Sequence, residues 1–244
     1  MDQPVALITG GAKGIGRGIA LDLAARHWKI ALCYRTSEAE ANATAQDIMA
    51  RGGRSLAIRC DVSDPVAAKS LVAQIEQEWG RIDVLINGAG PYHRINLFDE
   101  TVEGWNEMFD GNLHPIFYLA QAVAPGMKTR KAGRIINFSM ANADQMEAQP
   151  DVTGHYIAKA GVLILTRTLA KLLAPYGITV NAISPGFIDS GSAPPQELAA
   201  MTKRIPAGYI GTIDDTVAAV RYLLSEEARY VTGANIQISG GWGI

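Results

Sequence analysis

A glycine-rich segment near the start of the chain constrains the fold more than any other feature. The apolar run Val5–Ile8 leads directly into Thr9-Gly10-Gly11-Ala12-Lys13-Gly14-Ile15-Gly16, and apolar residues at helical spacing follow in Arg17–Ala24. This order predicts a buried strand, a tight turn and a helix. Glycine permits positive φ angles and close approach of the backbone to a ligand, and a helix start presents free N–H groups. The segment therefore predicts a pyrophosphate site formed by Gly10, Gly14, Ile15 and Gly16, with an ordinary turn as the alternative.

Strand-like and helix-like segments alternate along the whole chain. The expected strands are Val5–Ile8, Lys29–Tyr34, Ser55–Arg59, Ile82–Ile86, Gly133–Phe138, Thr179–Ile183 and Ala234–Ile238. Two long helices are expected over Asn106–Lys128 and His155–Ala174, and a loop over Pro185–Pro195. The alternation, a length of 244 residues and 48% hydrophobic residues predict one α/β domain over 1–244, a doubly wound parallel sheet. Ligands of such sheets bind at the carboxyl ends of the strands, so the loops there are expected to line a site.

Composition narrows the partners. The net charge of −2 gives no reason to expect a nucleic-acid partner. Cys33 and Cys60 lack metal-ligand spacing, so we expect two buried thiols and no metal site. No signal peptide and no apolar run long enough to span a bilayer is present, so we expect a cytoplasmic protein without membrane contact. The two long helices carry more apolar residues than one sheet face needs, which predicts a symmetric homo-oligomer, a dimer or tetramer. The residues that suggest this are Leu163, Leu165, Leu169 and Leu172.

The end of the second expected strand carries no acidic residue. In NAD-binding folds an acid about 20 residues past the glycine loop takes the ribose 2′-OH. Here the residues are Cys33-Tyr34-Arg35-Thr36-Ser37, and Lys13 lies in the glycine loop. Two cations and two hydroxyls at one corner suit a 2′-phosphate, so we expect NADP(H), with NAD(H) as the alternative cofactor. Tyr34, Arg35 and Thr36 would line that corner; the competing interpretation makes the cations solvated surface charges.

The turn after the third expected strand is a second candidate nucleotide contact. Asp61 is expected to accept a hydrogen bond from the adenine amine, and Val62 to lie against the ring. The alternative for Asp61 or Asp64 is to cap the following helix.

Further motifs resemble those of the classical short-chain dehydrogenase/reductases over nearly the whole chain. These are Asn87-Gly88-Ala89-Gly90, Asn112-Leu113, Gly133–Asn137, Lys159-Ala160-Gly161, Asn181–Gly186 and Tyr230–Gly233. The resemblance implies a Rossmann fold, an NAD(P)(H) cofactor, often a tetramer built through the two long helices, and oxidoreduction of a small-molecule carbonyl/alcohol pair or activated double bond. It also implies that Asn112 holds a water of the proton relay. Its implied cofactor contacts are Asn87, Gly88, Ala89, Lys159, Pro185, Gly186 and Ile188.

The chain departs from the family pattern where the reaction needs hydroxyl groups. The family places a proton-donating Tyr four residues before a Lys that holds the nicotinamide ribose, and a Ser after the fifth strand. Four residues before Lys159 stands His155, and Tyr156 comes one residue later. Met140 stands at the serine position, and Ser139 comes one residue earlier. Both hydroxyl groups are thus displaced by one residue.

Three interpretations of this departure remain open. His155 is the acid/base, although the neighbouring Lys159 opposes its protonation. Alternatively, a tightened first turn of the helix brings Tyr156 inward, since residues three apart also share a face. Third, the protein binds the cofactor as a sensor or scaffold with impaired or absent dehydrogenase activity. The loop after the fourth strand, Pro91-Tyr92-His93-Arg94, offers His93 and Arg94 to a polar substrate or to solvent.

Overall fold

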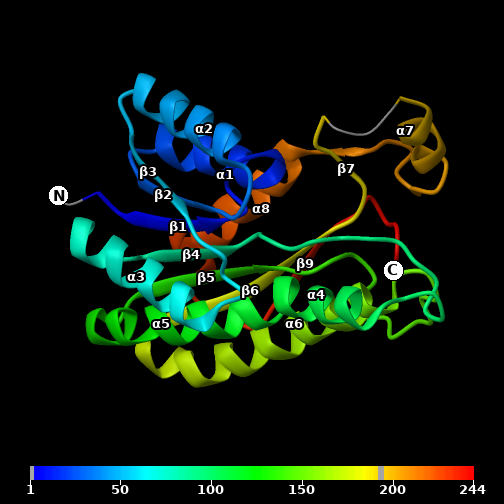
Figure 1. The fold of residues 1–244 in the computed structure, drawn as a ribbon. Helices are drawn as coiled ribbons and strands as arrows, with labels where there is room; N and C mark the ends of the chain where they lie inside the picture. Colours follow the sequence, from blue (N-terminus) through cyan, green and yellow to red (C-terminus); the bar gives the residue numbers. More distant parts are fainter. Residues whose placement is uncertain (1–2, 192–194) are drawn as a thin grey trace.

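The computed structural model describes residues 3–191 and 195–244, and its centre is a parallel sheet of seven strands (Figure 1). The strands are β1 Val5–Thr9, β2 Lys29–Tyr34, β3 Arg54–Arg59, β4 Val84–Asn87, β5 Gly133–Phe138, β6 Ile178–Pro185 and β9 Asn235–Ile238. Their order is β3-β2-β1-β4-β5-β6-β9, so the direction of winding reverses between β1 and β4. Such a reversal opens a crevice at the carboxyl ends of the strands. The predicted doubly wound α/β class is confirmed.

Helices cover both faces of the sheet (Figure 1). One face carries α1 Gly14–Ala25, α2 Glu38–Ala50 and α8 Ile213–Leu224, and the other carries α3 Pro65–Trp79, α4 Val102–Asn112, α5 His114–Arg130 and α6 Thr153–Leu173. Successive residues of β1 enter opposite layers: Val5 and Leu7 pack in the core under α3 and α5, and Ala6 and Ile8 in the core under α1 and α8. Because both faces are buried, the strand is apolar throughout.

The remaining elements are short and lie mostly near the carboxyl end of the sheet. They are η1 Ala174–Tyr176, β7 Ile188–Asp189, α7 Pro195–Thr202, β8 Gly211–Thr212 and η2 Glu226–Ala228. The predicted loop Pro185–Pro195 is therefore wrong at Ile188, which pairs with Gly211 in a two-stranded parallel sheet. None of the helices in the described ranges is both long and apolar enough to cross a membrane.

The single long helix predicted over Asn106–Lys128 is wrong, because the chain breaks it at Leu113 into α4 and α5. The Asn112 amide donates to the Met108 carbonyl at 2.9 Å, so a side chain competes there with the helical backbone. Pro115 has no N–H to donate to the carbonyl four residues before it. Together these residues end one helix and begin another, which places Asn112 at a junction rather than inside a helix.

The apolar excess of α6 is only partly on the surface. Leu163 is buried against Ala143 and Ala182, so its assignment to an outward face is wrong. Leu172 is 62% exposed, in line with the expectation, and Ile164, which is not among the expected residues, is 65% exposed. The outward face of α6 thus keeps Leu172 of the predicted set, loses Leu163 and gains Ile164.

Candidate functional site

The glycine turn joins three segments at the reversal of the sheet. Gly10 has φ +68° and Gly14 has φ +55°, both in the region that favours glycine. A Cβ added to Gly16 would lie 2.2 Å from the Gly10 carbonyl oxygen, and one on Gly10 would lie 2.9 Å from the Ala89 nitrogen. Thr9 Oγ1 accepts from the N–H of Ala89 at 3.2 Å. Glycine is therefore required for the end of β1, the start of α1 and the loop after β4 to meet.

The start of α1 is open to an anion. Lys13, at the N-cap position, makes no side-chain hydrogen bond to the helix, and the first turn of α1 has no acidic residue. In contrast, Asp64, Thr101 and Thr212 cap α3, α4 and α8 through their side chains. The N–H groups and positive dipole end of α1 are thus free of a side-chain cap, as a bound phosphate would require.

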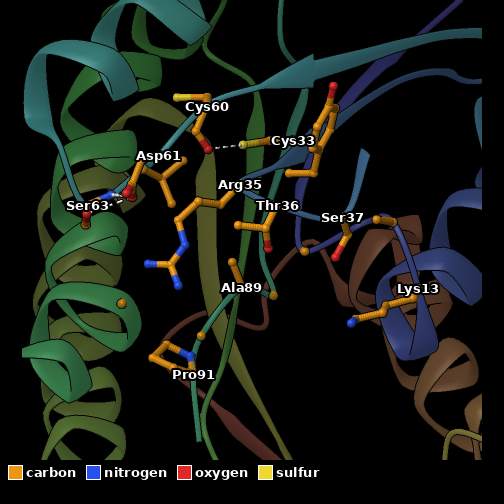
Figure 2. A pocket seen from close by; sticks show the side chains of 17 residues that line it. Lys13, Cys33, Arg35, Thr36, Ser37, Cys60, Asp61, Ser63, Ala89 and Pro91 are labelled. Atoms are coloured by element: carbon orange, nitrogen blue, oxygen red, sulfur yellow. Dashed lines mark hydrogen bonds between the residues drawn. The ribbon is translucent and has the colours of Figure 1, made fainter. Parts of the chain in front are cut away.

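A pocket of about 330 Å³ lies beside this turn, at the ends of β1, β2 and β3 (Figure 2). The predicted cofactor residues that line it are Gly10, Lys13, Tyr34, Arg35, Thr36, Asp61, Val62, Gly88 and Ala89. The other predicted cofactor residues lie outside its lining. Gly14, Ile15 and Gly16 form the adjoining start of α1, and Asn87, Lys159, Pro185, Gly186 and Ile188 lie on β4, α6, β6 and the segment that follows β6. The structure therefore brings the predicted adenosine-side residues together.

Positive charge reaches the pocket from two sides. Figure 2 shows the Arg35 guanidinium lying across the pocket and the Lys13 side chain on the opposite side, with Thr36 and Ser37 between them. Arg35 forms an ion pair with Glu107 of α4 at 3.6 Å, and both side chains are about half exposed. The glycine turn and the end of β2 therefore offer two cations and two hydroxyls, and Glu107 of the sequence-distant α4 is the acid paired with Arg35.

Asp61 and Asp64 have separate roles. Asp64 caps α3 by accepting from the Val66 N–H at 2.8 Å, so the capping alternative holds for Asp64. Asp61 accepts from the N–H and the hydroxyl of Ser63 at 3.0 and 2.7 Å. Burial raises the pKa of Asp61, but the bonds from Ser63 and the charge of Arg35 outweigh it and hold this pKa below its ordinary value. The Asp61 carboxylate is thus a fixed acceptor at the pocket wall.

Cys33 and Cys60 also line the pocket, as free and buried cysteines. The Cys33 thiol donates to the Cys60 carbonyl at 3.6 Å, drawn as a dashed line in Figure 2. Hydrogen bonding to Cys60 and burial raise the pKa of the Cys33 thiol. The two side chains form an apolar wall, in line with the expectation of buried thiols.

A second group of polar side chains surrounds the start of α6. The Lys159 ammonium is buried and donates to the Phe138 carbonyl at 2.9 Å, and burial lowers its pKa to about 8. The Ser139 hydroxyl donates to the Lys159 backbone carbonyl at 2.8 Å, so it fastens β5 to α6. Met140 packs against the small cluster that contains Leu163. The residue at the serine position is thus apolar, and the neighbouring hydroxyl bonds to the backbone.

His155 and Tyr156 are both buried, but they face different surroundings. The Tyr156 hydroxyl donates to the Asn142 carbonyl at 2.8 Å and accepts from the Glu147 N–H at 3.1 Å. No tightened turn brings it inward, because α6 is regular from Thr153 and the Tyr156 N–H bonds to Val152. The Tyr156 phenol therefore closes the loop after β5.

His155 lies where the family resemblance places the proton donor. Its Nδ1 is buried and has no hydrogen-bond partner among the described residues. Burial and the charge of Lys159 lower its pKa to about 4; His93 adds to this, and the Pro91 carbonyl opposes it. The imidazole is thus neutral at pH 7. The Tyr92 ring lies edge-on to it, with ring centroids 5.0 Å apart.

Asn112 links the helix junction to the loop after β4. Its amide donates to the Pro91 carbonyl at 3.0 Å, and its Oδ1 is buried without a partner. A Cβ on Gly90 would lie 2.2 Å from this oxygen, and one on Gly111 would lie 2.3 Å from Pro91 Cδ. These two glycines let α4 approach Pro91, and an unpaired acceptor beside them suits a water or a ligand group.

Two contacts of the site gave no signal in the sequence. Glu107 reaches Arg35 only because α4 crosses beside the pocket, and nothing in the local pattern of α4 predicts that. Tyr92 reaches His155 because the loop after β4 folds against the start of α6. Ser63 could have been found, since an Asp followed by Ser two residues later is typical of a side-chain-closed turn.

Known proteins resemble this chain over nearly its full length. A family model described as enoyl-(acyl carrier protein) reductase matches residues 10–243. The 3-oxoacyl-(acyl-carrier-protein) reductase FabG of Staphylococcus aureus is 36% identical over 97% of this chain and 96% of its own, and FabG of Escherichia coli is 35% identical over the same shares. A short-chain type dehydrogenase/reductase from Mycobacterium marinum is 32% identical with a TM-score of 0.91, covering 99% of this chain and 96% of that one.

A further solved structure contains a nucleotide. It is a blue fluorescent protein from a metagenomic library in complex with NADPH, 31% identical with a TM-score of 0.90, covering 100% of this chain and 99% of that one. The sheet order, the glycine turn and these similarities all indicate the same family. The chain therefore belongs to the short-chain dehydrogenase/reductase family of oxidoreductases.

Proposed function

We propose that this protein is an NADP(H)-dependent oxidoreductase that acts on a carbonyl/alcohol pair or an activated double bond of a small molecule. The observation that carries the proposal is the uncapped start of α1 beside a pocket that holds Lys13 and Arg35. A pyrophosphate fits the first feature and a 2′-phosphate the second. The NADPH of the 31% identical fluorescent protein supports the same cofactor, and the names of the FabG relatives support a reductase.

The residues have separate tasks in this proposal. NADPH, when bound, supplies the hydride. Lys159 holds the nicotinamide ribose from a buried position that its bond to Phe138 fixes. Asn112, whose Oδ1 lacks a partner, holds a water, and His155 lies where the substrate oxygen is expected. The remaining predicted cofactor contacts belong to the nicotinamide side; they are Asn87, Pro185, Gly186 and Ile188.

A second candidate is a cofactor-binding protein with impaired or absent dehydrogenase activity, a sensor or scaffold. The bonds of the Ser139 and Tyr156 hydroxyls to backbone groups favour it. Both candidates predict NADPH binding, and only the first predicts turnover.

Turnover separates the two candidates. NADPH binding is measured by fluorescence titration, and NADPH oxidation is followed with a panel of carbonyl compounds. The panel starts with 3-oxoacyl thioesters, because the 36% identical relatives are named for them. Tight NADPH binding with substrate-dependent oxidation supports the oxidoreductase. Binding without turnover on any compound favours the sensor or scaffold, and absence of binding contradicts both.

We also propose a symmetric dimer or tetramer. Phe117 of α5 and Ile157, Ile164 and Leu172 of α6 are large apolar side chains on the surface. An isologous contact would bury these side chains on both subunits. Sedimentation of the purified protein at micromolar concentration should give at least twice the 26.1 kDa chain mass, and a monomer mass contradicts the proposal.

A further inference from the structure

The reaction proposed above needs a proton donor for the substrate oxygen, and the groups around α6 are poor donors at neutral pH. The neutral imidazole of His155 carries only a weakly acidic N–H. The hydroxyls of Tyr156 and Ser139 both donate to backbone carbonyls. A donor at neutral pH must therefore come from another element that reaches the same place.

Tyr92 is such a group. Its ring lies 5.0 Å from the His155 ring between centroids, with the planes at 88°. It follows Pro91, which lines the nucleotide pocket, so the loop after β4 runs from that pocket to His155. Tyr92 is 63% exposed, and its hydroxyl forms no hydrogen bond with the described part of the chain. It is thus an exposed phenol that packs against His155.

The backbone around Tyr92 is fixed. The N–H groups of Ile95 and Leu97 bond to the carbonyls of Asp151 and Pro150 at 2.8 and 2.9 Å. Arg94 forms an ion pair with Asp151 at 3.1 Å, which ties the same loop to the segment before α6. His93 pairs with Glu100 within the loop. These contacts position Tyr92 against the start of α6, as a group that acts on a substrate must be positioned.

We propose that Tyr92 is a catalytic residue that donates the proton to the substrate oxygen, taking the role that the family gives to a tyrosine at the place of His155. This inference rests on the proposed function. As the carbonyl carbon receives hydride, the Tyr92 O–H bond breaks and its proton forms the O–H bond of the product alcohol. Water reprotonates the exposed phenolate. In total the carbonyl gains one hydride and one proton.

His155 acts as a positioning residue in this arrangement. The groups that face it are the Lys159 ammonium, the ring of His93, the Pro91 carbonyl and the ring of Tyr92. Its imidazole supports the Tyr92 ring edge-on and keeps the phenol at the site. A ring at position 155 is thus needed for geometry, and a phenol at position 92 for the chemistry.

The test compares Tyr92→Phe, Tyr92→Ala and the unaltered protein, with Tyr222→Phe of α8 as a matched control. On a substrate that the carbonyl panel identifies, Tyr92→Phe should lower kcat by about a hundred- to ten-thousand-fold, since that is the usual contribution of a general acid. NADPH affinity should stay within about twofold of the unaltered value, and Tyr222→Phe should retain full kcat.

A second readout does not depend on activity. NMR titration of the His155 ring should give nearly the same midpoint in Tyr92→Phe, because the ring still covers it. In Tyr92→Ala the midpoint should move toward the ordinary histidine value, because water reaches the imidazole. These results support the placement of Tyr92 over His155.

Full kcat in Tyr92→Phe overturns the donor role while leaving the proposed function intact. In that case loss of kcat in His155→Phe would transfer the role to His155. An unaltered His155 midpoint in Tyr92→Ala overturns the placement. An unaltered protein that binds NADPH but turns over no substrate overturns the proposed function, and the donor role with it.

Discussion

The nucleotide half and the reacting half of the site place their polar groups in opposite ways. At the ends of β1, β2 and β3, Lys13 and Arg35 lie in an open pocket and the start of α1 carries no side-chain cap. Around the start of α6, Lys159, His155 and Tyr156 are all buried, and two of them bond to the protein's own backbone. The first half presents groups to a ligand, whereas the second holds groups in place.

The difference follows from whether the charged groups of each half are exposed to water or buried. Exposed cations attract a phosphate while water still solvates them in the free protein, so they cost little before binding. A buried ammonium or imidazolium loses hydration, which lowers its pKa and favours the neutral form. Lys159 and His155 both show this shift. Changes to the exposed charges of the nucleotide half should therefore alter affinity, and changes to the buried groups of the reacting half should alter stability and rate.

The largest effect should come from the turn that joins the two halves. Gly16→Ala places a methyl group 2.2 Å from the Gly10 carbonyl oxygen, so the backbone must move. We expect a loss of about 3 kcal/mol in the free energy of unfolding, together with loss of NADPH binding. Gly52→Ala is the control: its φ is +79° but no atom lies within 4 Å, so about 1 kcal/mol is expected. Urea unfolding measures both, and equal losses would contradict the packing argument.

The next effect is the pH dependence of stability in the reacting half. The pKa of His155 is lowered from 6.5 to about 4, so the unfolded chain binds a proton in that window while the folded protein does not. Stability therefore falls as the pH falls from 6.5 to 4, by up to about 3 kcal/mol. His155→Phe should remove this part of the slope, measured as unfolding free energies between pH 8 and 4. An unchanged slope would show that His155 does not titrate in that window.

A smaller effect is expected in cofactor choice. Replacing both Lys13 and Arg35 with Ala should weaken NADPH binding by about 10- to 100-fold, because charge-assisted hydrogen bonds to the 2′-phosphate are lost. NADH affinity should change little. Fluorescence titration with each cofactor measures the preference. Equal curves for NADPH and NADH in the unaltered protein would refute the role of this corner.

The smallest effect concerns the ion pair that crosses the pocket. Glu107→Gln releases Arg35 from a pair 3.6 Å long between half-exposed groups, so NADPH should bind up to about fivefold more tightly. The gain should shrink at high salt, since exposed charges are screened. An equal gain for NADH would mean that Glu107 acts on pocket access instead of on the 2′-phosphate.

Much of the nucleotide half could be predicted because its rules are local. Gly10 and Gly14 have the positive φ angles that the glycine pattern indicates, and alternating strands and helices predict where the strand ends meet. The absence of an acid after β2 is visible in Cys33–Ser37 alone. The doubly wound sheet followed from the alternation of strands and helices, because helix and strand periodicity depend mainly on neighbouring residues, whereas the family was indicated by resemblance of motifs along the whole chain.

The reacting half depended on tertiary structure. The sequence placed His155 and Tyr156 at the start of a helix, but only the fold showed that the Tyr156 phenol bonds to the loop after β5. Nor could the sequence bring Tyr92 to His155 or Glu107 to Arg35, since each pair joins separate elements. The sequence by itself determined the alternation of strands and helices along the chain and the glycine turn. Packing between elements decided which side chains share a pocket, because that depends on distances through space.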